Sequence, residues 1–170
     1  GVLAITLGCG FFSLIQDAVA EAVDIPVFAS PLMMIPLILR MLGKGKSVCV
    51  LTASKRLLSP EFFEAVGVTK EMPVVVAGLD DSEDLPFNAV SLGGTSIEVD
   101  VDGLRSDVVD AVQEAIKADA SIGAVLLECA SFQLFAADIN QATGLPVFDY
   151  NVYIDMVYRA VVPKRYQGFL

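Results

Sequence analysis

Residues 124–148 read AVLLECASFQLFAADINQATGLPVF, and this stretch decides the fold. An unbroken apolar run ends at a cysteine, a segment with helical spacing of apolar positions follows, and a Pro-Val-Phe tripeptide starts a second apolar run. Apolar runs that alternate with helix-period segments are typical of βαβ units, whose strands are parallel and buried. We therefore predict a strand, a helix and a second parallel strand.

The same unit occurs a second time near the start of the chain. Residues 4–28 read AITLGCGFFSLIQDAVAEAVDIPVF, and at an offset of 120 they match residues 124–148 at nine of 25 positions. Cys9 and Cys129 each stand seventeen residues before a Pro-Val-Phe tripeptide. Any two βα units share leucines and alanines, because both need apolar strands and amphipathic helices. This need does not explain why a cysteine stands at the same position in both units. The pattern therefore indicates an internal duplication.

The duplication also predicts what surrounds the first copy. In the second half, the apolar run at residues 46–52 precedes the cysteine unit, whereas its counterpart would lie before Gly1. We therefore expect about 70 residues of the first half to lie outside this sequence.

Apolar runs and helix-period segments alternate along the rest of the chain. The expected strands are residues 2–8, 26–29, 46–52, 73–78, 123–128 and 146–149. The expected helices are residues 11–23, 31–42, 60–66, 101–119, 132–143 and 152–162. This order predicts an α/β fold with two pseudo-symmetric lobes, mostly parallel sheets flanked by helices, and an active site in the cleft between the lobes. We expect residues 1–45 with 151–170 to form the first lobe and residues 46–150 the second.

Composition narrows the class of protein. Of the 170 residues, 55% are hydrophobic, which suits a sheet that is covered by helices on both faces. The most apolar stretch, residues 31–42, is too short to cross a bilayer, because a crossing needs about 20 residues. A net charge of −10 argues against nucleic acid as a partner. Three cysteines cannot all pair, which favours reduced thiols and a cytoplasmic location. The absence of histidine excludes Ser-His-Asp and Cys-His catalysis.

One segment breaks the alternation. Residues 80–102 are acidic, contain a Gly-Gly pair and show little periodicity, which predicts a solvated surface loop. A metal-binding acidic cluster is the alternative, but the acidic residues lack regular ligand spacing. We expect no metal and no cofactor.

The positions of the two cysteines suggest a chemistry. Ligands of parallel sheets bind beyond the carboxyl ends of the strands, and two duplicated halves would face those ends across one cleft. Cys9 and Cys129 would then approach one ligand from opposite sides. A thiol at a helix amino terminus has a lowered pKa, so one cysteine can act as thiolate base while the other acts as acid. This geometry predicts proton transfer at a carbon next to a carboxylate.

Further residues are candidates for substrate binding. Backbone N–H groups of residues 10–12 and 130–132 would hold the carboxylate and the enolate-like charge that develops. Hydroxyls after the next strand could also bind substrate, although such hydroxyls equally often form turns and caps. The candidate binding residues are Gly10, Phe11, Thr52, Ser54, Ala130 and Ser131. Cys49 lies in the middle of a predicted strand, so we predict that it packs in the core.

Several motifs resemble the aspartate/glutamate racemase family over nearly the whole chain. They are GCGF at 8–11, PVF at 26–28, VLTA at 50–53, LEC at 127–129 and ATGLPVFD at 142–149. The resemblance implies two similar α/β lobes, a catalytic cysteine from each lobe, and no need for pyridoxal phosphate. It implies that Cys9 and Cys129 are those cysteines and that Thr52 lies near a substrate-binding position.

The sequence departs from the family pattern next to both cysteines. Glutamate and aspartate racemases usually carry Asn-Thr after the first cysteine and Thr after the second, whereas this chain has Gly10-Phe11 and Ala130. Phe11 indicates a larger or more apolar substrate side group. The family also includes decarboxylases, which normally keep one cysteine, so two cysteines favour racemase, epimerase or isomerase chemistry. The leading expectation is a racemase or epimerase of an amino acid or related carboxylic acid.

Three alternatives remain at this point. One is a cysteine-dependent isomerase of the maleate isomerase kind, another is a decarboxylase of a dicarboxylate, and the third is a non-catalytic small-anion-binding protein. The expected partner is a small carboxylate, with neither nucleic acid nor membrane, and the sequence leaves a homo-oligomer open.

Overall fold

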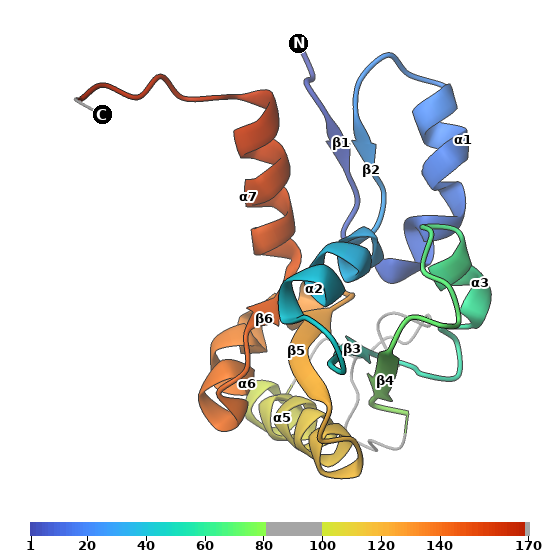
Figure 1. Cartoon of the computed structure of the whole chain (residues 1–170), viewed down its shortest axis with the longest axis vertical. Helices are drawn as coiled ribbons and strands as arrows, with labels where there is room; N and C mark the ends of the chain where they lie inside the picture. Colours follow the sequence, from blue (N-terminus) through green and yellow to red (C-terminus); the bar gives the residue numbers. More distant parts are fainter. Residues whose placement is uncertain (81–99, 169–170) are drawn as a thin grey trace.

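The computed structural model describes residues 1–80 and 100–168. Within them, a four-stranded parallel sheet has the order β4-β3-β5-β6, and a separate two-stranded parallel sheet consists of β1 and β2 (Figure 1). The strands are β1 (Ile5–Thr6), β2 (Val27–Phe28), β3 (Ser47–Thr52), β4 (Val74–Gly78), β5 (Ile122–Leu127) and β6 (Val147–Phe148). The predicted α/β class with parallel sheets flanked by helices is confirmed.

Helices occupy the predicted intervals between the strands. The α-helices are α1 (Gln16–Glu21), α2 (Ile35–Leu42), α3 (Pro60–Glu64), α5 (Val101–Ala118), α6 (Ala136–Thr143) and α7 (Tyr150–Val161). The 3-10 helices are η1 (Gly10–Ile15), η2 (Pro31–Met34) and η3 (Ala130–Phe135), and each leads directly into an α-helix. The sequence predicted the helices but not their tight first turns. It also overestimated β1, because its parallel ladder with β2 is only two residue pairs long.

The four-stranded sheet has a core on each face, which follows from the alternation of side chains along a strand. Cys49 and Leu51 of β3 face α5 and α6 together with Val125 and Leu127 of β5. Val48 and Val50 face α2 together with Ala124 and Leu126. Cys49 is fully buried, so its predicted role in core packing is confirmed.

The two copies of the repeat have the same strand register. In the first copy Ile5 pairs with Val27, and in the second copy Val125 pairs with Val147, a shift of 120 residues for both partners. The 3-10 helices η1 and η3 start and end with the same shift. The repeated residues therefore produce the same local structure twice.

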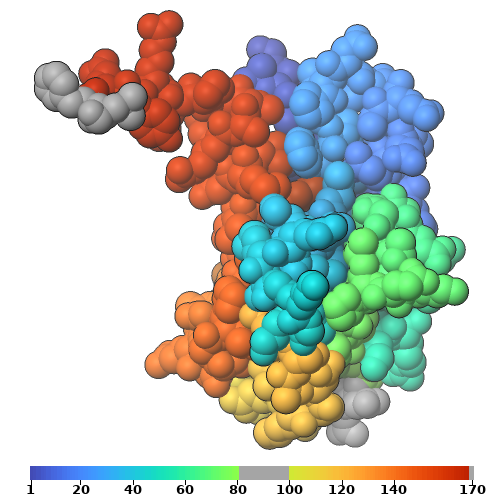
Figure 2. All heavy atoms as spheres, viewed as in Figure 1, coloured from blue at the N-terminus to red at the C-terminus, as the bar shows by residue number. Residues whose placement is uncertain are grey.

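The helix after each copy packs differently. After the first copy, α2 lies on the four-stranded sheet, with Ile35 and Ile38 buried against β3 and β5. After the second copy, α7 extends beside β1, and a groove between them is lined by Leu3, Ala4 and Thr6 on one side and residues such as Val157 on the other. Figure 1 shows this arrangement, and Figure 2 shows the atoms of α7, in red, against the blue N-terminal residues. The lobe boundaries at residues 45 and 151 stay a prediction.

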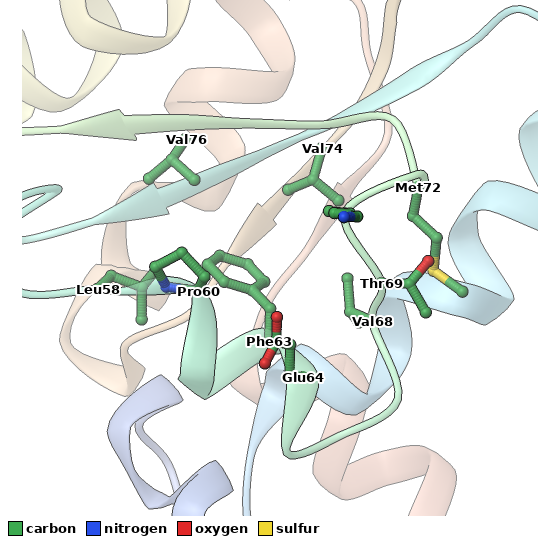
Figure 3. Close-up of a pocket in the computed structure, with 10 residues that line it drawn as sticks. Leu58, Pro60, Phe63, Glu64, Val68, Thr69, Met72, Val74 and Val76 are labelled. Atoms are coloured by element: carbon green, nitrogen blue, oxygen red, sulfur yellow. The ribbon is translucent and has the colours of Figure 1, made fainter.

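Three further points concern the expected absence of a membrane span, the acidic loop and the pockets of the structure. Within the described ranges, no helix combines the length and apolar character that a bilayer crossing requires. The predicted acidic loop falls largely on residues 81–99, which lie outside the described residues. A pocket of about 260 Å³ lies between α3 and β4, with Phe63, Val74 and Val76 among its lining residues (Figure 3). It contains none of the predicted site residues.

Candidate active site

Cys9 and Cys129 occupy equivalent places, each just after a strand and just before a 3-10 helix. Both have extended backbone, with φ −146° and ψ 140° at Cys9 and φ −107° and ψ 132° at Cys129. The first turn is closed in the same way in each copy, by Phe12 N–H to the Cys9 carbonyl at 3.2 Å and by Phe132 N–H to the Cys129 carbonyl at 3.1 Å. The repeat therefore presents both thiols from one local geometry.

The two cysteine segments meet directly. Ala130 N–H donates to the Gly8 carbonyl at 2.8 Å, and Gly10 N–H donates to Glu128 Oε2 at 2.5 Å. The two thiols also share a hydrogen bond, which raises the pKa of Cys9 and lowers that of Cys129. The structure thus brings together the two cysteines that the sequence predicted as a pair.

Glu128 is a functional candidate outside the predicted site residues, although the sequence shows that it precedes Cys129 where Gly8 precedes Cys9, a difference that can tune the two thiols or only reflect solvent exposure. Its side chain is 1% exposed and lies between the two segments. Oε1 accepts a hydrogen bond from Thr52 Oγ1 at 2.8 Å, and Oε2 lies 3.9 Å from Cys9 Sγ, which donates to it. Burial raises the pKa of Glu128 to about 7, partly opposed by the Thr52 hydrogen bond. The available signal was a carboxylate at the end of a fully apolar strand, where a charge needs a reason to be buried.

The thiols have opposite electrostatic environments. The hydrogen bond from Cys9 lowers the pKa of Cys129 to about 6 against the effect of burial, and the N–H and hydroxyl of Ser131 lower it further. The pKa of Cys9 is raised by the hydrogen bond to Cys129, by burial and by the charge of Glu128, although Phe11 N–H lowers it. These opposite shifts favour the thiolate at Cys129 and the neutral thiol at Cys9.

The N–H groups predicted to hold a substrate carboxylate are engaged within the protein. Gly10 and Ala130 use theirs across the junction between the segments, while Phe11 and Ser131 direct theirs to the thiols. Thr52 lies at the site but donates its hydroxyl to Glu128. These residues therefore build the thiol pair and its support.

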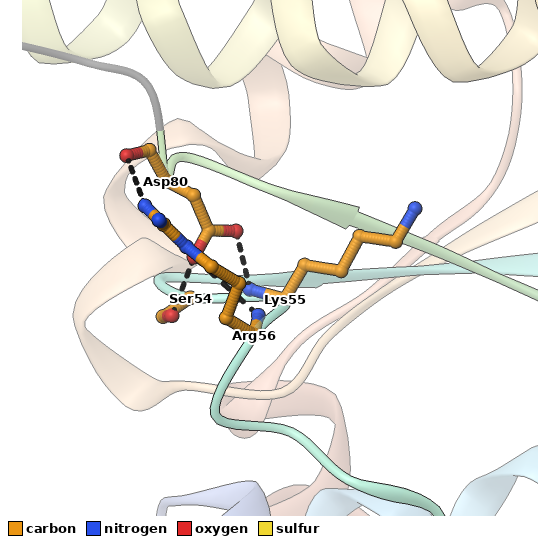
Figure 4. Close-up of polar contacts among 4 residues, drawn as sticks. All are labelled: Ser54, Lys55, Arg56 and Asp80. Atoms are coloured by element: carbon orange, nitrogen blue, oxygen red, sulfur yellow. Dashed lines mark hydrogen bonds and ion pairs between the residues drawn. The ribbon is translucent and has the colours of Figure 1, made fainter.

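Ser54 lies apart from this group. Its hydroxyl donates to Asp80 Oδ1 at 2.5 Å, and the same carboxylate accepts from Lys55 N at 2.7 Å and from Arg56 Nε at 3.1 Å (Figure 4). Desolvation alone would raise the pKa of Asp80, but the hydrogen bonds from Ser54, Arg56 and Lys55 outweigh it and lower the pKa. The structure places Ser54 in a network that holds the turn after β3, which is the turn-forming alternative for such a hydroxyl.

The fold and the thiol pair define a class of protein: an α/β protein with two parallel-sheet units whose matched cysteines meet. The sequence profile of the Asp/Glu/Hydantoin racemase family matches residues 1–152. The chain belongs to this family, which confirms the resemblance seen in its motifs. Proteins of this family and the relatives described below are enzymes.

Two curated relatives are similar over most of this chain. The dimethylsulfoniopropionate lyase of Durusdinium sp. clade D is 30% identical over 166 residues, which cover 95% of this chain and 54% of that protein. Dimethylsulfoniopropionate lyase 5 of Emiliania huxleyi is 32% identical over 159 residues, which cover 88% of this chain and 32% of that protein. The chain thus spans about half or less of the length of these relatives.

Solved structures share the fold at lower identity. Allantoin racemase from Klebsiella pneumoniae superposes with a TM-score of 0.63 at 22% identity, covering 94% of this chain and 60% of that one. Glutamate racemase RacE1 from Bacillus anthracis superposes with a TM-score of 0.59 at 14% identity, covering 94% of this chain and 59% of that one. At these identities the likeness shows the fold alone.

Proposed function

We propose that this chain carries the thiol pair of an enzyme that removes the proton next to the carboxylate of a small acid. Cys129 is the base and Cys9 is the protonated partner, and the reaction uses no cofactor. The observation that carries the proposal is the hydrogen-bonded pair of thiols with opposite pKa shifts. A base whose pKa is about 6 is a thiolate at neutral pH, the form that accepts a proton.

Two outcomes can follow removal of the α-proton. In β-elimination, the proton passes to Cys129, its electron pair forms a carbon-carbon double bond, and the bond to a β-substituent breaks. A dimethylsulfonium group would leave as neutral dimethyl sulfide and needs no proton from the enzyme. In racemisation, the proton is returned to the opposite face of the carbon by Cys9, and the roles reverse for the other enantiomer.

Elimination is the first candidate and racemisation or epimerisation the second. The relatives that are about 30% identical are named lyases, whereas the racemases share only the fold. In addition, a racemase needs each thiol as base in one direction, and the charge of Glu128 opposes ionisation of Cys9. This asymmetry favours a reaction that needs one base.

The test is incubation of the protein in D₂O with dimethylsulfoniopropionate and, separately, with single enantiomers of candidate amino acids and hydantoins. Gas chromatography measures dimethyl sulfide, and proton NMR measures α-deuterium. Release of dimethyl sulfide supports elimination, and α-deuterium in an otherwise intact substrate supports racemisation. The matched control is Cys129→Ser, which should abolish either signal.

Other results would overturn the proposal. A covalent adduct on one cysteine during conversion of a cis dicarboxylate to its trans isomer would indicate nucleophilic isomerisation instead. Loss of carbon dioxide from a dicarboxylate would indicate a decarboxylase. Tight binding of a carboxylate with neither product nor deuterium uptake would indicate a non-catalytic anion-binding protein.

A further inference from the structure

Glu128 is a buried acid that the proposed reaction does not use as its base. We propose that Glu128 is a positioning residue that keeps a proton on Cys9 and thereby makes Cys129 the base. The inference rests on the proposed function, because it explains which of the two thiols takes the substrate proton.

The carboxylate of Glu128 is held by the first cysteine segment and by the end of β3. Gly10 N–H and Cys9 Sγ approach Oε2 at 2.5 and 3.9 Å from the first copy, and Thr52 Oγ1 approaches Oε1 at 2.8 Å from the end of β3. A side chain at position 10 would collide with this carboxylate, since a Cβ on Gly10 would overlap Oε2. The space left by Gly10 is therefore filled by Glu128.

Above its pKa of about 7 this carboxylate is ionised, and its charge is not balanced by a cation among the described residues. The ion pairs formed by the described residues involve Asp80, Asp102 and Asp138, and none includes Glu128. A buried negative charge close to a thiol disfavours the thiolate. Cys9 has one S–H proton and two possible acceptors, Glu128 Oε2 and the Cys129 thiolate, and it must stay neutral to donate to either of them.

Only the second copy of the repeat carries a carboxylate directly before its cysteine. The position equivalent to Glu128 in the first copy is Gly8, so the first copy supplies no matching carboxylate. At Gly8 the neighbours are the Ala130 methyl group and the ring of Tyr150, whose hydroxyl is 3.3 Å from Thr6 Oγ1. Tyr150 is therefore the titratable group that α7 adds to this junction, beside Glu128 and the two thiols.

The experiment measures each thiol directly and needs no substrate. The full chain is treated with iodoacetamide across a pH series, and mass spectrometry of peptides gives the alkylation rate of each cysteine. In the unchanged protein, Cys129 should react at neutral pH and Cys9 only at alkaline pH. Cys49, which is fully buried, reports whether the fold is intact.

Glu128→Gln keeps the shape of the side chain and removes its charge. We expect the alkylation profile of Cys9 to move to lower pH by about one unit, which is about a tenfold faster rate at a given pH below its midpoint. Thr52→Val is the matched control, because it removes one hydrogen bond to Glu128 but keeps the carboxyl, which is ionised in the alkaline range where Cys9 reacts, so the Cys9 profile should move much less than in Glu128→Gln. An unchanged Cys9 profile in Glu128→Gln would overturn the inference.

The Cys129→Ser background separates Glu128 from the coupling between the thiols. There, Cys9 should still titrate at high pH, and adding Glu128→Gln should again lower its midpoint. If Cys9 titrates as an ordinary thiol in Cys129→Ser alone, the neighbouring thiol rather than Glu128 protects it, and the inference is wrong. Since every readout is alkylation, its failure is distinct from failure to turn over a substrate.

Discussion

The two copies of the repeat share their local geometry but differ in their surroundings. In both, a parallel strand is followed a few residues later by a cysteine that precedes a 3-10 helix of six residues, and the strand register is the same. Yet Phe12 is 43% exposed, whereas its counterpart Phe132 is fully buried. The second copy belongs to a sheet with helices on both faces, while β1 pairs within a two-stranded sheet. Repeated residues thus determine the turn, and neighbouring elements determine burial.

The same comparison explains the unequal thiols. Each cysteine receives a backbone N–H from the residue two positions later, Phe11 or Ser131, so this contribution is alike in both copies. The difference arises one residue before each cysteine, where Gly8 stands in the first copy and Glu128 in the second. Glu128 contacts Cys9 and Gly10 of the first copy, so its charge opposes ionisation of the cysteine of the other copy.

The largest expected effect separates the two cysteines by function. Cys129→Ser removes the base and should lower kcat/KM by about 10²- to 10⁴-fold. Cys9→Ser keeps a hydroxyl that can donate to the Cys129 thiolate, so under elimination its loss should be at most about tenfold, well below the range for a removed base. Steady-state kinetics of both variants, measured on the substrate that the D₂O screen identifies, checks this difference.

Equal losses in the two variants would show that the copies act symmetrically, as a two-base racemase requires. Cys49→Ala is the matched control, because this cysteine lies on the α5 face of the sheet outside the thiol pair. Its kcat/KM should equal that of the unchanged protein.

A smaller effect concerns the residue after each cysteine. Gly10→Ala introduces a methyl group that would overlap Glu128 Oε2, so the carboxylate must move, and we expect a loss of about 1–3 kcal/mol in the free energy of unfolding. Ala130→Gly at the equivalent position removes a methyl group and should cost about 1 kcal/mol. Urea denaturation measures both.

A double variant tests the cause of the Gly10 effect. If the methyl group acts on the carboxylate, Gly10→Ala combined with Glu128→Ala should cost less than the sum of the two single changes. Strict additivity would mean that Gly10 is needed for a reason unrelated to Glu128.

Much of this organisation could be predicted from the sequence. The βαβ alternation and the offset of 120 residues predicted the parallel strands and the equivalence of Cys9 and Cys129, because both depend on patterns local to each unit. The roles of Thr52 and Glu128 could not be predicted in this way. Thr52 donates to Glu128 at the carboxyl ends of β3 and β5, and Glu128 reaches Gly10 from the other copy, so these contacts depend on how distant segments pack.

The smallest expected effect tests buried hydroxyls near the first cysteine. Ser13 is 1% exposed, and within the described part of the chain its Oγ has no hydrogen-bond partner, as is also the case for Oε1 of its counterpart Gln133. Ser13→Ala removes a buried polar group that gains no hydrogen bond, so the free energy of unfolding should stay the same or rise by up to about 1 kcal/mol.

Ser30→Ala is the matched control for that change, because Ser30 is equally buried but accepts from Leu32 N–H at 3.1 Å and donates to the Gly10 carbonyl at 3.3 Å. Loss of this N-cap should cost about 1 kcal/mol. In urea denaturation, the free energy of unfolding should fall for Ser30→Ala and should stay the same or rise for Ser13→Ala. If Ser13→Ala is destabilised as much as Ser30→Ala, the Ser13 hydroxyl has a hydrogen-bond partner in solution. A high-resolution crystal structure should then reveal a water molecule bound to it beside η1.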